Sequence, residues 1–548
     1  MIAGVVRKAR QLIADPTLRR WFLGRALGRY QKPAEFLPHV PPYASDMLPL
    51  SQEAFNPQTQ FDPLITAHPT TPLILDLPGE TVTVSPAAVD SLFDRIFSDI
   101  ETQLAVHRFQ WVCLQGDQVD PEWVTAIWQA WSARFSSPDD NWAWHPYTAT
   151  ERAVNILRFF RRFGLPDTAR DTLHILAAHG PAIASKLEYF GDHNTSNHLA
   201  NNGRGLFILG LELGLSDCTA LGAEILHREA NRSFRESGIL REQSSHYQAL
   251  LSAHYMECAQ LAERYKSEYA PALRDIADHA YGALAYLMLP GGMPLIGDIS
   301  PDLPPKVLLS RLNVSETQMQ DLSSEGWLRM HSDDWSGLWH CSPDGWSHMP
   351  GHGHQDCGSF ELHFGSERVF VDPGRGAYGE EGEAAFYRSA DVHNGLTVNG
   401  TDPYPANKPY YNSQFRSDEC GLVPTLTRTD DGILVEHHGY SRLGDVGSVQ
   451  RQWQFHAEGL QIKDTVQGSG HHQLRRALVT PLACRYDEEK IILKGKNVSY
   501  QISSDAEIIL KPIKIWTAYG VANDGIQIVF QTSTSLPWIG HIDVEVLR

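Results

Sequence analysis

The spacing of apolar residues changes once along this chain of 548 residues, and that change constrains the fold more than any other feature. From about residue 86 to residue 290, apolar side chains recur at helical spacing, as in the segment 151–165. After about residue 325, apolar and polar residues alternate between closely spaced turns, which predicts antiparallel strands. Helices followed by strands indicate two segregated domains, an α+β multidomain class.

Gly, Pro or Asp marks many joints between the predicted helices, and short joints place successive helices antiparallel, as in a bundle, a solenoid or a toroid. No repeat of fixed period is visible, which disfavours a regular helical array. We therefore expect an N-terminal helix with a Pro-rich arm at residues 1–85, a helical domain at 86–312 and a strand domain at 313–548. A ligand cleft is expected between the last two.

The charge balance excludes one class of partner. The chain has 46 Lys and Arg against 65 Asp and Glu, a net charge of −19, whereas a general nucleic-acid binder needs a basic surface. The seven cysteines form no CxxC pair, which argues against a disulfide framework and a cysteine-based zinc site.

The sequence has no apolar run of membrane-spanning length and no visible signal peptide, so we expect a cytoplasmic protein, or a periplasmic one if a leader is missing. Residues 1–30 fit two interpretations. They predict either a basic amphipathic helix that lies on a membrane or a partner, or an ordinary surface helix.

Polar side chains gather in GDHNTSNHLANNGRG, residues 191–205, where a helix is expected to begin. Asn197 and Asn201 share one face of this helix, and His198 lies beside them. Capping explains one Asn or Ser but not the whole cluster, which favours a polar binding site over caps and loop packing. Tyr247 lies on a later predicted helix, where a tyrosine taken alone is more often a packing residue.

A second polar segment, GHGHQDCGSFELHFGSERVFVDPGRGAYG, is followed by RSADVHNGLTVNG. It contains His352 and His354 two residues apart, then Asp372 at the end of a predicted strand, then His393. Two imidazoles and a carboxylate suit a zinc-type ion with a water or a weak fourth ligand. The alternative is a hydrogen-bonded polar cluster without a metal.

This second segment resembles the C-terminal signature of the heparinase II/III family of polysaccharide lyases, and residues 191–205 resemble the helical-domain motif of that family. The resemblance covers roughly residues 90–450. It implies an incomplete (α/α) toroid followed by an antiparallel β-sandwich. It also implies β-elimination of a polysaccharide or oligosaccharide that contains uronic acid, amino-uronates included, leaving a C4–C5 unsaturated sugar.

The resemblance further implies roles for individual residues. Asn197 and His198 match the pair that meets the acidic group of the substrate, and Tyr247 and His352 match the catalytic tyrosine and histidine. The remaining matches are the ligands of a structural zinc (His354, Asp372, His393) and candidate substrate contacts (Asn201, Tyr387, Arg388).

Three more candidate contacts come from residue chemistry. Trp142 and Trp144 lie in a predicted loop, and aromatic rings stack well on sugars, although packing in the core is an equal alternative. Arg204 is suited to pair with a substrate carboxylate, but a structural ion pair explains it equally well.

Elimination requires amide and imidazole donors to stabilise the carboxylate next to C5, a base for the C5 proton and an acid for O4. Asn197, His198, Tyr247 and His352 have the right chemistry. A glycoside hydrolase would need two flanking carboxylates, and Glu212 and Glu242 look like surface or packing residues. A non-catalytic carbohydrate-binding or polysaccharide-biosynthesis accessory protein remains an alternative, as does a metal hydrolase with an open metal position.

Overall fold

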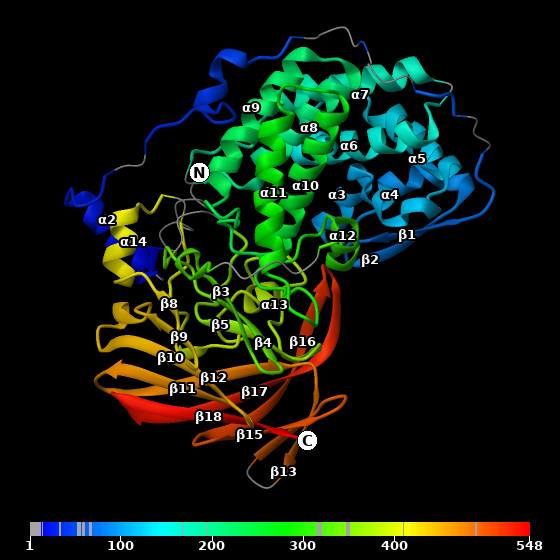
Figure 1. The fold of residues 1–548 in the computed structure, drawn as a ribbon. Coiled ribbons are helices and arrows are strands. Elements are labelled where there is room, and N and C mark those ends of the chain that lie inside the picture. The colour runs from blue at the N-terminus through cyan, green and yellow to red at the C-terminus, as the bar shows by residue number, and fades with distance from the viewer. Residues whose placement is uncertain are drawn as a thin grey trace.

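The computed structural model describes residues 12–548 apart from residues 14, 32–33, 52–55, 57–60, 65–67, 167, 193, 315–320, 347–350, 409 and 488–489. The helical domain packs on one side of the strand domain (Figure 1). This order of helices and strands confirms the predicted α+β class. No helix among the described residues is long and apolar enough to cross a membrane.

Ten α-helices of the described chain form the helical domain. They are α3 (Ile100–Arg108), α4 (Gln110–Gln115), α5 (Pro121–Phe135), α6 (Pro146–Phe163), α7 (Ala169–Ala184), α8 (Asn197–Leu213), α9 (Ser216–Ser233), α10 (Ser245–Arg264), α11 (Ala270–Tyr286) and α12 (Pro305–Leu312). Consecutive helices such as α8 and α9 pack side by side, and a continuous apolar core links them. Gly214 ends α8 with a φ of +70°, a left-handed conformation that strains residues with a Cβ atom.

The strand domain contains three sheets of purely antiparallel strands among the described residues. Their strands are β3 (Trp327–Ser332), β4 (Trp335–His340), β5 (Ser359–Phe364), β6 (Glu367–Phe370), β7 (Leu396–Val398), β8 (Thr425–Arg428), β9 (Gly432–His437), β10 (Val446–His456), β11 (Gly459–Gly468), β12 (His471–Thr480), β13 (Ala483–Asp487), β14 (Lys490–Lys494), β15 (Ser499–Ser504), β16 (Glu507–Ala518), β17 (Val521–Ser535) and β18 (Trp538–Leu547). The spatial orders are β13-β14-β15-β18-β11-β10-β9-β8, β16-β17-β12-β7 and β3-β4-β5-β6. Side chains from all three sheets form one apolar core, which is typical of stacked sheets.

The N-terminal arm contacts both domains. Its helix α2 (Pro16–Ala26) packs on α14 (Ser413–Cys420) of the strand domain through an aromatic cluster. Farther along, the backbone amide of Asn56 donates to the carbonyl of the last residue of α8, and that of Leu64 donates to the carbonyl of Leu165, just after α6. A hairpin of β1 (Leu73–Leu77) and β2 (Glu80–Val84), which the sequence analysis did not predict, packs against the helical domain. Of the segment 1–30, residues 1–11 and 14 lie outside the described part of the chain.

A buried ion pair joins β10 to β11. The guanidinium of Arg451 donates to both carboxylate oxygens of Asp464, at 2.6 Å and 3.1 Å, and Arg476 lies 3.9 Å from the same carboxylate. All three side chains are buried. Removal of one partner from such a group leaves a charge in the interior without compensation.

We expect Asp464→Ala to lower the free energy of unfolding by about 3–5 kcal/mol, the usual effect of breaking a buried ion pair. Urea unfolding followed by circular dichroism measures this change. Asp524→Ala is the control, because it breaks the exposed pair between Lys514 and Asp524 and should leave stability unchanged. Equal stability of the two variants would contradict the prediction.

Candidate active site

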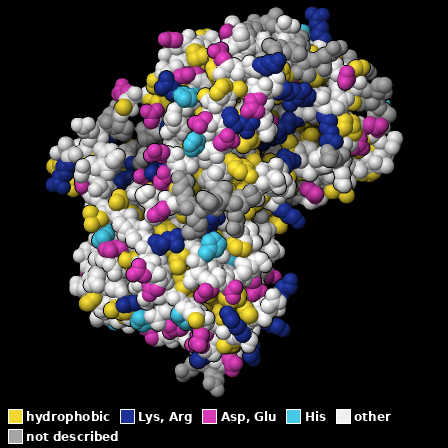
Figure 2. Space-filling model, viewed as in Figure 1, with side chains coloured by type: hydrophobic (Ala, Val, Ile, Leu, Met, Phe, Trp, Pro, Cys, Tyr) yellow, Lys and Arg dark blue, Asp and Glu magenta, His cyan; other side chains and the backbone are white. Residues whose placement is uncertain are grey.

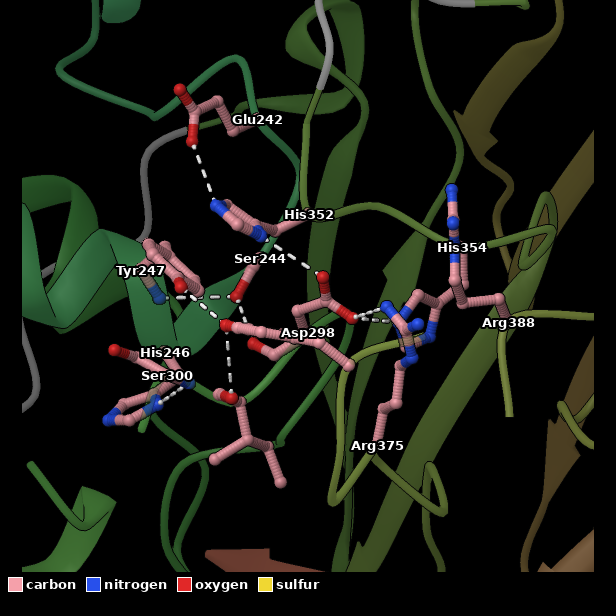
Figure 3. Close-up of polar contacts among 12 residues, drawn as sticks. Glu242, Ser244, His246, Tyr247, Asp298, Ser300, His352, His354, Arg375 and Arg388 are labelled. Atoms are coloured by element: carbon pink, nitrogen blue, oxygen red, sulfur yellow. Dashed lines mark hydrogen bonds and ion pairs between the residues drawn. The ribbon is translucent and has the colours of Figure 1, made fainter. Parts of the chain in front are cut away.

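Tyr247 and His352 meet where the helical domain faces loops of the strand domain (Figure 3). Tyr247 lies in the first turn of α10, and His352 precedes β5. Their rings stack at a centroid distance of 3.5 Å and an interplanar angle of 6°. Asn197 begins α8, and its side-chain nitrogen lies 3.2 Å from Nε2 of His352. The structure therefore brings three of the four predicted catalytic residues into direct contact across the domain interface.

Asp298, which the sequence analysis missed, connects these loops. One carboxylate oxygen accepts from Nδ1 of His352 at 3.0 Å, and the other accepts from Nε2 of His354 and from Nη1 of Arg375, both at 2.9 Å. Burial alone raises the pKa of Asp298, but the hydrogen bonds from the two histidines outweigh burial and hold the pKa well below its usual range. The ionised carboxylate favours the tautomer of His352 that has its proton on Nδ1 and its lone pair on Nε2.

The backbone around Asp298 explains why the carboxylate reaches this position. The amide of Asp298 donates to the carbonyl of His352 at 2.7 Å. Gly297 has a φ of +79°, and a Cβ atom there would lie 2.6 Å from the carbonyl oxygen of Gln243, so only glycine permits this close approach. Ser244 caps α10 by accepting from the amide of Tyr247 and donates to the carbonyl of Asp298.

Glu242 is a site residue, which corrects its prediction as a surface or packing residue. It is buried, and its carboxylate accepts from the backbone and side-chain nitrogens of Asn197, both at 2.7 Å. It also lies 3.6 Å from Nε2 of His352. By contrast, Glu212 is buried in an ion pair with Arg161, as expected of a packing residue.

Glu242 and Asp298 thus place two carboxylates beside His352, the feature that a glycoside hydrolase would need. A hydrolase requires one of them to be a protonated acid that reaches the leaving oxygen. Asp298 is instead held by three donors, one of them the cation of Arg375, and Glu242 is held by Asn197. This arrangement disfavours hydrolysis. The sequence analysis disfavoured it because it identified no flanking carboxylates, whereas in the structure both carboxylates are present but held by hydrogen-bond donors.

The phenol of Tyr247 is buried and hydrogen-bonded. Its oxygen lies 2.5 Å from the hydroxyl of Tyr378, a second residue that the sequence analysis missed. Burial raises the pKa of Tyr247 well above its ordinary value. Tyr247 is therefore a protonated phenol at neutral pH in the free protein.

His198 follows Asn197 in the first turn of α8 and contacts a different set of residues. Its Nδ1 lies 2.7 Å from the carboxylate of Glu188, and its ring packs against Tyr147. Burial lowers the pKa of His198, but the charge of Glu188 and the hydrogen bond to it more than offset burial and raise the pKa above its ordinary value. The side chain is partly exposed, and Glu188 favours its cationic form.

Two predicted contacts on α8 lie deeper in the helical domain. Arg204 is buried and pairs with Glu151 at 2.6 Å and with Glu257 at 2.9 Å, so the structure gives it the ion-pair role rather than a substrate contact. Asn201 accepts from Arg204. Its buried side-chain nitrogen has no hydrogen-bond partner among the described residues.

The remaining candidates divide by exposure. Trp142 is 53% exposed and can stack on a sugar, and Arg388 is partly exposed in an ion pair with Glu380. Trp144 is buried against Trp131, which corrects its prediction as a sugar platform. Tyr387 is also buried, and its hydroxyl is occupied by the backbone of β16, so the structure does not place it as a substrate contact.

The predicted zinc residues form a buried polar cluster. Nδ1 of His393 lies 2.8 Å from Asp372, and the rings of His354 and His393 are 5.2 Å apart. Nδ1 of His354 and Nε2 of His393 are buried and have no hydrogen-bond partner in the described chain. These two imidazole nitrogens suit a zinc ion, whereas Asp372 contacts the opposite side of the His393 ring. Within the described ranges, no three His, Cys, Asp or Glu side chains already converge as a complete metal site.

Comparison with known proteins fits this geometry. Residues 315–536 match the family described as Heparinase II/III-like, C-terminal. The strand domain is therefore similar to the C-terminal domain of heparinase II/III-like proteins. This match confirms the predicted resemblance, and the heparinase II/III-like domain carries His352, His354, Asp372 and His393.

Solved structures extend the similarity to the helical domain. A crystal structure of heparinase III is 16% identical, with 83% of this chain and 79% of that chain covered and a TM-score of 0.64. The heparan sulfate lyase HepC from Pedobacter heparinus is 15% identical, with 83% and 78% covered and a TM-score of 0.52. At this identity the similarity establishes the fold, an incomplete toroid followed by a β-sandwich, as predicted. No curated protein was found to match the chain.

The pair of His198 and Glu188 makes a testable electrostatic prediction. We expect Glu188→Gln to lower the pKa of His198, because the substitution removes the carboxylate that stabilises the imidazolium. NMR titration of 13C-labelled histidine measures this pKa, with His198→Asn to assign the resonance. Asp192→Asn is the control, because Asp192 bonds to Tyr189 instead. An unchanged pKa in Glu188→Gln would contradict the assignment.

Proposed function

We propose that the protein is a polysaccharide lyase that cleaves a uronic-acid-containing polysaccharide or oligosaccharide by β-elimination. The observation that carries the proposal is the stack of Tyr247 on His352, with the amide of Asn197 beside Nε2 of the histidine. A base, an acid and a carboxylate-binding donor then lie within one small site. These are the groups that elimination next to a carboxylate requires.

In this mechanism His352 is the base. Asp298 holds the proton on Nδ1, so the lone pair of Nε2 is directed toward Asn197. A uronate whose carboxylate binds the Asn197 amide would place its C5 proton near this lone pair. The cationic form of His198, which Glu188 favours, would add positive charge at the start of α8 and stabilise the dianionic intermediate.

Tyr247 is the acid in this mechanism. Because its phenol is protonated at neutral pH, it can donate a proton to O4 as the C4–O4 bond breaks. The hydroxyl of Tyr378, 2.5 Å away, can then donate to the phenolate that forms. The product carries a double bond between C4 and C5.

The alternative is a non-catalytic accessory protein on the same fold. Such a protein has no need of a stacked Tyr–His pair or of a carboxylate that fixes the histidine tautomer. The complete arrangement of Tyr247, His352 and Asp298 supports the enzyme instead.

The direct test is incubation with a panel of uronate polysaccharides and amino-uronate oligosaccharides. We expect absorbance in the near ultraviolet to rise with time as C4–C5 double bonds form. New reducing ends without this absorbance would indicate hydrolysis, and binding without any product would indicate an accessory protein. Either result would contradict the proposal.

The roles of the two rings make a second prediction. We expect Tyr247→Phe to lower kcat by at least about a hundredfold, because it removes the proton donor while the ring still packs on His352. Tyr255→Phe is the control on the same helix, since its buried hydroxyl donates only to the Leu226 carbonyl, and it should retain the kcat of the wild type. Near-normal turnover of Tyr247→Phe would reduce Tyr247 to a packing residue.

We further propose one structural zinc ion at the cluster of His354 and His393. Their unpartnered nitrogens would hold it, and Asp372 would orient the His393 ring from behind, as carboxylates commonly do for zinc-bound histidines. A zinc ion held there would tie the loop before β5 to the loop before β7.

We expect protein purified without added metal to contain zinc, and His393→Ala to contain less zinc and to unfold at lower temperature. Elemental analysis and thermal unfolding measure the two effects. His279→Ala, at an exposed histidine of α11, is the control. Metal-free protein with full stability would contradict the zinc proposal.

A further inference from the structure

Helix α2 carries apolar side chains on two opposite faces. One face, with Leu18 and Trp21, is buried on aromatic residues of α14 and its neighbours. On the other face, Phe22 is 48% exposed, Leu23 is 62% exposed and Leu27, which follows the last turn, is 61% exposed. These three side chains form an exposed apolar patch on a helix that also carries arginines. The outward face of α2 therefore offers an apolar patch to a partner.

The outward face is also basic. Residues 15–30 contain four arginines and one carboxylate, although the whole chain has a net charge of −19. The carboxylate, Asp15, caps the helix, and Arg20 pairs with Glu419. Arg19, Arg25 and Arg29 are exposed, although Arg19 also donates to the carbonyls of Leu12 and Ile13 and Arg25 lies 6.0 Å from the ring centroid of Trp21. The edge of the molecule that α2 occupies in Figure 1 shows Lys and Arg side chains in Figure 2.

The exposed apolar side chains and the positive charge of this face distinguish between two possible partners, a second copy of the chain and a lipid surface. A symmetric dimer would place the patch against itself and bring the arginines of both copies together. A stable protein interface also buries about 800 Å² per partner, far more than three apolar side chains provide. An anionic lipid surface needs only a few inserted apolar groups and neighbouring cations, and it attracts this part of an otherwise acidic protein.

We propose that α2 docks the protein on an anionic lipid surface. Phe22, Leu23 and Leu27 enter the boundary between headgroups and acyl chains, and Arg19, Arg25 and Arg29 contact the lipid phosphates. The buried face of α2 keeps the strand domain attached during docking. Binding is reversible and weakens with salt, because much of it is electrostatic. This inference is independent of the proposed lyase activity.

The test is sedimentation of the full chain with vesicles of phosphatidylcholine alone or of phosphatidylcholine mixed with phosphatidylglycerol, at low and high salt. We expect binding to the mixed vesicles only, lower at high salt. Phe22→Ser with Leu23→Ser should weaken binding by at least about tenfold, as should Arg25→Glu with Arg29→Glu. All four side chains are exposed, so circular dichroism and thermal unfolding should match those of the wild type.

Matched controls lie on the strand domain. Val521→Ser with Ile539→Ser removes two residues that are each 53% exposed, and Lys494→Glu with Lys511→Glu reverses two exposed charges. Both controls should bind like the wild type. Absence of binding, or equal binding to both kinds of vesicle, would overturn the proposal. Binding that depends on the arginines but not on Phe22 and Leu23 would also overturn it, because that pattern indicates attraction to any polyanion, such as an acidic polysaccharide, without insertion into lipid. Self-association that Phe22→Ser with Leu23→Ser abolishes would assign the face to a second copy and also overturn it.

Discussion

The carboxylate of Asp298 is the interaction on which the candidate site depends. It lies in the connection between α11 and α12, and its partners His352, His354 and Arg375 all come from the strand domain. A buried carboxylate requires this many donors, because an ionised group in the interior is costly without them. The same contacts therefore stabilise the domain interface, orient the proposed base and position the first histidine of the proposed zinc site.

Around this carboxylate, burial and charge give neighbouring groups different protonation states. Burial keeps Tyr247 protonated, while Glu188 favours the cationic form of His198. Asp298 accepts from Nδ1 of His352, an arrangement that favours the tautomer with its lone pair on Nε2. A β-elimination needs an acid, a base and a group that stabilises negative charge next to one another. The packing around each side chain, and not its residue type alone, favours a different protonation state for each group.

The site could be predicted from the sequence where polar residues were clustered within a short segment. Asn197 and His352 stand in such segments, and the structure brings them together. Asp298 was missed because it is a single carboxylate, although residues 279–297 before it contain no Asp, Glu, Lys or Arg, a signal that could have indicated it. Trp144 and Arg204 were suggested as contacts because a sequence does not show that a loop tryptophan is packed inward or that Glu151 and Glu257 reach the same arginine.

The sequence by itself determined the succession of helices and strands, because local periodicity decides which face of each element is apolar. It also determined the motif residues that the heparinase II/III-like domain contributes. Only the tertiary structure decided which residues of each motif meet at the site, that Glu242 and Asp298 join them, and that α2 is covered on one face alone. These properties depend on contacts between residues far apart in the chain, and a local sequence pattern does not show which distant residue a buried side chain will contact.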